Sequence, residues 1–165
     1  MSRAFVKEGD GEDALQALRV PSPEVNYVTP RGLEMLRDEV KTLTQLRDQH
    51  QGLENLSSQS VVREAERDLV YYLDRLRTAV LVEPAANPEG QVRFGSKVRA
   101  MDEAGEVYEV VLVGEDEADV QNGRISYVSP LARALLKARV GDEVLWKRPL
   151  GEVRLEIVSV DGVSD

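Results

Sequence analysis

The hydrophobic pattern of the chain changes its period once, near the middle. Between Leu33 and Val80 apolar side chains recur every three or four positions, the spacing of one face of an α-helix. Beyond Gln91 they alternate with polar side chains, as in half-buried β-strands. The segment Pro84–Gly90 between these parts is rich in helix-breaking residues. The pattern therefore predicts a helical part and a β part joined by a linker.

The helical part divides into two predicted helices. Thr29 is a good N-cap and Pro30 suits the first helical position, while the second helix is expected to begin near Ser58 or Ser60. Only a short polar link separates the helices, and neither can bury its apolar stripe alone. An antiparallel hairpin is the simplest arrangement. The two stripes comprise Leu33, Leu36, Val40, Leu43 and Leu46, then Val62, Ala65, Leu69, Leu73, Leu76 and Val80.

The second half predicts a small, mostly antiparallel β domain with one short helix, which begins at Ser129 and Pro130 and runs through Leu136. The fold class is therefore α+β. Strands are expected at Val92–Phe94, Lys97–Met101, Glu106–Val113, Ile125–Tyr127, Glu143–Lys147 and Val153–Val160. The predicted organisation is a flexible acidic extension (1–26), a helical hairpin (27–83), a linker (84–90) and a β domain (91–165).

Composition narrows the classes of function. The 165 residues carry a formal net charge of −9, which disfavours gripping nucleic acid by its phosphates and suits a basic groove on another protein. The absence of cysteine excludes a disulfide framework, a thiolate metal site and a cysteine nucleophile. No signal peptide, membrane-length apolar run, catalytic triad or phosphate loop is visible. We expect a cytoplasmic protein that needs no cofactor and is not an enzyme.

Three segments resemble a known family. These are Tyr27–Leu36, which reads YVTPRGLEML, Arg93–Val98, which reads RFGSKV, and Ile125–Leu136, which reads ISYVSPLARALL and is followed by Val140-Gly141-Asp142-Glu143-Val144. Together they resemble the Gre transcript-cleavage factors, GreA and GreB, and the second half is most similar to GreB-like members. The resemblance covers about residues 27–160.

The resemblance implies a fold, a partner and a docking surface. The implied fold is an N-terminal antiparallel coiled coil followed by a domain like that of FK506-binding proteins (FKBP-like). The implied partner is bacterial RNA polymerase, with the C-terminal domain on the β′ subunit at the rim of the secondary channel and the hairpin inside the channel. The predicted partner-binding residues are Val128, Ser129, Pro130 and Leu131. Charged residues at positions 130 and 131 are expected to weaken polymerase binding without unfolding the domain.

The hairpin tip departs from the family pattern. The family tip reads Gly-Asp-x-x-Glu-Asn, and its carboxylates help to hold a second Mg²⁺ in the polymerase active site. Here Gly52 is followed by Leu53, Glu54 and Asn55, so one carboxylate remains. Each arm is about one heptad shorter, which reduces the reach by about 10 Å. Glu54 and Asn55 are the candidate tip residues of a polymerase-binding elongation regulator that does not stimulate cleavage.

Three other functions are compatible with parts of the sequence. The chain could be an authentic cleavage factor with a remodelled tip, or a regulator of nucleoside diphosphate kinase, a label attached to a short-hairpin class of the superfamily. A prolyl isomerase is suggested only by the implied fold of the second half. The few aromatic residues there are needed for its own core, which disfavours the isomerase.

Overall fold

A computed structural model describes residues 19–162 of the 165-residue chain. Most of the predicted extension over residues 1–26 therefore lies outside the described part. The chain divides into two compact units. Among the described residues, the first contains 19–23 and Leu36–Thr78, and the second contains Glu24–Met35 and 79–162. The short segments that flank the hairpin in sequence thus belong to the unit that holds the β-sheet.

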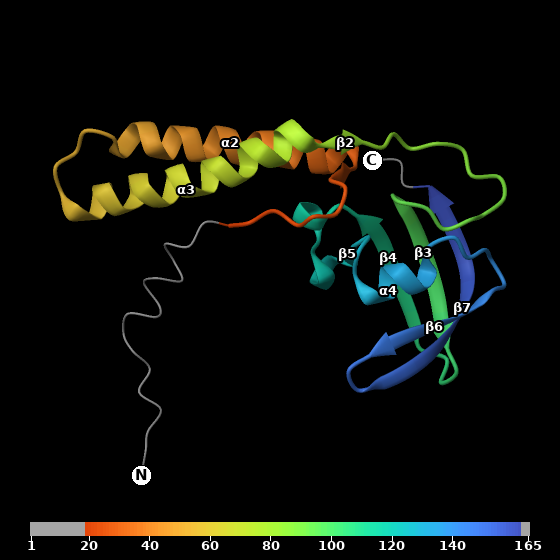
Figure 1. The fold of residues 1–165 in the computed structure, drawn as a ribbon. Helices are drawn as coiled ribbons and strands as arrows, with labels where there is room; N and C mark the ends of the chain where they lie inside the picture. Colours follow the sequence, from red (N-terminus) through yellow and green to blue (C-terminus); the bar gives the residue numbers. More distant parts are fainter. Residues whose placement is uncertain (1–18, 163–165) are drawn as a thin grey trace, which may run out of the picture. The chain divides into compact units, whose positions relative to one another are not determined.

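Two long helices, α2 (Pro30–His50) and α3 (Leu56–Thr78), run antiparallel, as Figure 1 shows. Leu36, Ala65 and Leu69 from the predicted stripes are buried. Leu46 and Val80 of the predicted stripes are 37% and 44% exposed, and the largest departure from the prediction is Leu73, whose side chain is 51% exposed. It directly follows Tyr71 and Tyr72, so the apolar run extends around the helix beyond the face that can be covered. Within the described residues, no helix is long and apolar enough to cross a membrane.

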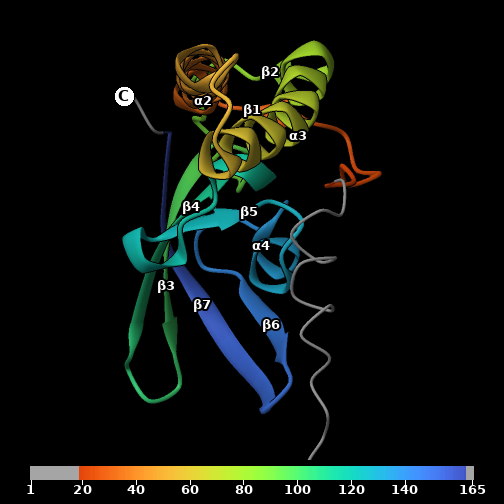
Figure 2. The same cartoon turned by 90° about the vertical axis from the view of Figure 1, so that its left-hand side faces the viewer.

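The second unit is built on a five-stranded sheet with the order β5-β4-β3-β7-β6. All neighbours are antiparallel except β4 and β5, which are parallel. The strands are β3 (Ser96–Asp102), β4 (Val107–Val113), β5 (Arg124–Ser126), β6 (Glu143–Arg148) and β7 (Gly151–Gly162). Figure 2 shows the strong twist of this sheet. With the two long helices, it makes the chain an α+β protein.

Between strands β4 and β5 the chain forms two 3₁₀ helices, η1 (Glu115–Glu117) and η2 (Val120–Asn122). A separate two-stranded parallel pair joins β1 (Tyr27–Val28) to β2 (Val80–Leu81). The sequence pattern did not predict this pair, since two-residue strands show no period. The pair places the start of α2 in the second unit.

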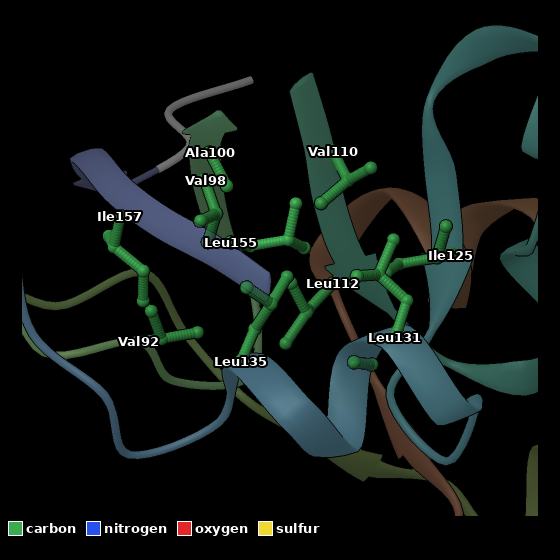
Figure 3. Close-up of a cluster of buried hydrophobic side chains, with 11 residues drawn as sticks. Val92, Val98, Ala100, Val110, Leu112, Ile125, Leu131, Leu135, Leu155 and Ile157 are labelled. Atoms are coloured by element: carbon green, nitrogen blue, oxygen red, sulfur yellow. The ribbon is translucent and has the colours of Figure 1, made fainter. Parts of the chain in front are cut away.

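The core of the second unit lies between the sheet and α4 (Pro130–Leu135). Eleven buried residues form it, as Figure 3 shows, with Leu135 of α4 among Leu112, Leu155 and other side chains from the strands. Strand β3 alternates as predicted, with Val98 and Ala100 buried and Lys97 and Arg99 exposed. The alternation therefore located the core face of this strand, and the Ser129-Pro130 pair located the helix that covers it.

One predicted strand is absent. Val92–Phe94 forms no strand, although Val92 is buried in the core. The backbone of Val92 exchanges two hydrogen bonds with the segment after α4, from its N–H to Ala138 O (2.8 Å) and to its carbonyl from Lys137 N (2.9 Å). A local pairing of this kind satisfies the backbone without extending the sheet.

Candidate functional site

The first candidate region is the hairpin tip, where the structure corrects the predicted helix start. Helix α3 begins at Leu56, and the side chain of Asn55 accepts a hydrogen bond from the backbone N–H of Ser58 at 2.7 Å. Asn55 is therefore the N-cap of α3, rather than Ser58 or Ser60. Before it, Gly52 has a φ of 84°, a left-handed conformation that glycine adopts without steric cost and that ends α2.

The chemistry of the tip follows from these local roles. Glu54 is exposed and is the one carboxylate between the two helices. The carbonyl of the Asn55 amide is occupied by its capping bond. Two apolar side chains of the tip are exposed as well, Leu53 by 48% and Leu56 by 82%. Among residues 19–162, no three histidine, aspartate or glutamate side chains come together in a way that could hold a metal ion. The tip residues thus fit Mg²⁺ poorly, because this ion prefers several oxygen ligands.

The second candidate region is the loop that leads into α4. Ser129 is the N-cap of this helix, as predicted, and its hydroxyl accepts a hydrogen bond from Ala132 N at 3.3 Å. Pro130 is exposed at the first helical position, while Val128 and Ser129 are half-buried. Leu131 is 8% exposed and packs in the core. The expectation that Leu131 tolerates a charge is therefore corrected, since it supports the loop from beneath.

A polar cluster at the start of α2 was not predicted. The buried carboxylate of Glu117 accepts a short hydrogen bond from the hydroxyl of Thr29, the N-cap of α2, and lies 3.5 Å from Arg31 Nη1. Arg124 Nε lies 4.0 Å from the same carboxylate. A Cβ atom at Gly32 would lie only 2.6 Å from Glu117 Oε1, so any larger residue at this position would displace the carboxylate. The sequence predicted Thr29 as an N-cap. It gave no indication that Glu117, one of three consecutive acidic residues, would be buried beside it.

Three aromatic rings also meet in the second unit. The centroids of Tyr27, Phe94 and Tyr127 lie 5.5–5.7 Å apart in every pair. The hydroxyl of Tyr127 donates a short hydrogen bond to the carbonyl of Val25. Each ring belongs to a different one of the three segments that carry the family resemblance. The sequence showed those segments separately, and only the fold brings them together.

The arrangement defines a class: an α+β protein with an antiparallel helical hairpin and a twisted β domain. Residues 87–162 match the family model described as "Transcription elongation factor, GreA/GreB, C-term". A GreB from Neisseria meningitidis serogroup B is 35% identical over 155 residues, covering 84% of this chain and 95% of the relative. A GreA from Thermodesulfovibrio yellowstonii is 32% identical over 150 residues, covering 81% and 94%. The chain belongs to the GreA/GreB family of transcription elongation factors.

Two further proteins are similar to this chain. A GreB from Pseudomonas syringae pv. tomato is 34% identical over 152 residues and covers 92% of each chain. Among solved structures, a GreA/GreB factor from Nitrosomonas europaea matches with a TM-score of 0.41 and 27% identity, covering 81% of this chain and 97% of that one. The family membership thus rests on the sequence relatives.

Proposed function

We propose that this protein binds bacterial RNA polymerase and regulates transcription elongation without stimulating transcript cleavage. In this proposal the β domain docks on the β′ subunit at the rim of the secondary channel, and the hairpin enters the channel. The protein acts in the cytoplasm, where the polymerase works, and it is not itself an enzyme. The relatives named GreA and GreB support the transcription role.

The observation that carries the cleavage part of the proposal is the composition of the tip. Stimulating hydrolysis in the polymerase active site requires carboxylates that hold Mg²⁺ at 2.0–2.1 Å. Glu54 alone is available, because the neighbouring position holds Leu53 and the Asn55 amide caps α3. The tip, with its single exposed carboxylate between Leu53 and Asn55, therefore lacks the second carboxylate of the family pattern.

The length of the chain gives additional support. The alignment with Neisseria meningitidis GreB has 155 positions, whereas 84% of this 165-residue chain is about 139 residues. About sixteen aligned positions of that relative (155 less 139) therefore lack a counterpart here, and the proposal assigns them to the two arms of the hairpin. The alignment with the Pseudomonas syringae GreB has no such deficit. The composition of the tip consequently carries more weight than its reach.

The docking surface is proposed to be the loop Val128–Pro130. Pro130 is exposed, and the loop is held rigidly by the Ser129 cap and by Leu131 in the core beneath it. A preorganised apolar loop loses little conformational entropy when it binds.

Binding to purified core RNA polymerase tests the docking part of this proposal. The fluorescently labelled protein should bind saturably, and unlabelled Neisseria meningitidis GreB should displace it. Pro130→Asp should weaken binding about tenfold through loss of apolar contact and a buried charge. Pro149→Asp, at an exposed proline in the turn between β6 and β7, is the matched control and should leave binding unchanged. Absence of displacement, or equal effects of the two variants, would contradict the proposal.

A further inference from the structure

A cavity of about 320 Å³ lies in the second unit, apart from the tip and the Val128–Pro130 loop. It is bounded by the start of α2, the chain after β2, the loop before β3 and the end of β4. This volume is at the lower end of the range for pockets that hold small organic molecules. Most of its wall is apolar and includes Val82, Pro84, Phe94, Val111 and Val113.

The charged residues that line this cavity are net positive, whereas the protein as a whole is net negative. Three arginines line it, Arg31, Arg93 and Arg124, against two glutamates, Glu83 and Glu117. The lining therefore carries a formal charge of +1 (three less two), in a chain with a net charge of −9. The N-terminus of α2 adds partial positive charge at the same place. An anion that avoids the rest of this acidic surface would be attracted here.

The three arginines differ in their partners: Arg31 and Arg124 lie near a carboxylate, whereas Arg93 contacts a neutral carbonyl. Glu117, whose side chain is 4% exposed, is matched by the Thr29 hydroxyl and by Arg31 and Arg124. Arg93 instead donates a long hydrogen bond of 3.5 Å to a neutral carbonyl, that of Ala86. A guanidinium has five N–H donors, so this contact leaves most of its capacity for another acceptor. Arg93 is also exposed, which places it within reach of a ligand from solvent.

We propose that this cavity is a binding site for a small organic anion with an apolar ring body and one acidic group. The ring body packs against the apolar wall beside Val82 and Val111, and the carboxylate, sulfonate or phosphate pairs with Arg93. Arg31 and Arg124 contribute long-range attraction while they remain paired with Glu117. Charge-assisted pairing of arginine with an oxyanion is among the stronger hydrogen bonds of proteins.

Two fluorescent probes that share one ring system test this proposal on the full-length protein. They are 8-anilinonaphthalene-1-sulfonate, which is anionic, and N-phenyl-1-naphthylamine, which lacks the sulfonate. The anionic probe should bind saturably at one site and more tightly than the neutral probe. Arg93→Gln should weaken binding of the anionic probe about tenfold and leave the neutral probe nearly unchanged.

Two further variants test whether the probes bind in this cavity. Arg99→Gln removes an exposed arginine on β3 outside the cavity and should change neither titration. Ala85→Trp adds a ring to an exposed position in the cavity wall and should abolish binding of both probes by filling the space. Circular dichroism of each variant should match that of the parent. Unsaturable binding, equal effects of Arg93→Gln and Arg99→Gln, or unchanged binding in Ala85→Trp would overturn the assignment.

Discussion

The β domain and the helical hairpin bury very different amounts of their side chains. Eleven buried residues form one cluster between the sheet and α4. Helix α3 buries only Ala65 and Leu69 among its apolar residues, although it is 23 residues long. Burial of apolar surface is the main favourable term in folding. We therefore expect the β domain to supply most of the free energy of folding. The hairpin is long but buries few apolar side chains.

The largest effect is expected where the predicted docking loop meets the core. Leu131→Asp should cost about 4 kcal/mol or more, because it buries an unpaired charge among apolar side chains. Pro130→Asp, one residue earlier and exposed, should change stability by less than about 1 kcal/mol. Urea denaturation followed by circular dichroism measures both. Equal losses would show that the loop and the core are not separate.

Removing one core side chain from the sheet should have the next largest effect. Leu155 is fully buried on β7, so Leu155→Ala should destabilise the β domain by about 3–5 kcal/mol through lost contacts and a cavity. Hydrogen exchange resolved along the chain measures it, and amides of β3 and β7 should lose protection first. A loss below about 1 kcal/mol would mean that the cluster is less tightly packed than its burial indicates.

The same kind of substitution in the hairpin should cost less and act locally. Leu69→Ala should cost about 2–3 kcal/mol and raise exchange of amides in α2 and α3, while the sheet stays protected. Leu73→Ala is the matched control on the same helix, since Leu73 is half exposed. If the sheet lost protection equally with Leu69→Ala, the two units would unfold as one and the comparison would fail.

The smallest structural effect should come from the cap of α3. Asn55→Ala should cost about 1 kcal/mol, because it removes the acceptor for the Ser58 amide at the start of the helix. Glu54→Ala, at the adjacent exposed position, should leave stability unchanged. Exchange of the Ser58 amide measures the difference. Equal exchange in the two variants would rule out a capping role for Asn55.

Residues that follow a period were predictable, and residues defined by contacts between distant segments were not. Alternation located β3, and the Ser129-Pro130 pair located α4, because both signals are local in sequence. The β1–β2 pair, the Glu117 cluster and the aromatic trio join positions far apart in the chain. A pattern within one segment cannot predict contacts between segments that are far apart in the sequence.

The tip and the docking loop show the same limit. Their positions followed from the family resemblance, but the capping role of Asn55 and the burial of Leu131 required the fold. The start of α3 was missed because three possible caps, Asn55, Ser58 and Ser60, lie within six residues. Their intrinsic preferences for the N-cap position are similar.

The central claim is that this family member binds the polymerase without stimulating cleavage, and one measurement tests it most directly. The purified protein is added to stalled, backtracked elongation complexes at a concentration shown to saturate binding, and the length of the labelled RNA is followed with time. Neisseria meningitidis GreB serves as the comparison factor, and Glu54→Ala as the tip variant. We predict no shortening of the RNA beyond the rate of polymerase alone, with or without the substitution. Efficient shortening that Glu54→Ala abolishes would contradict the account.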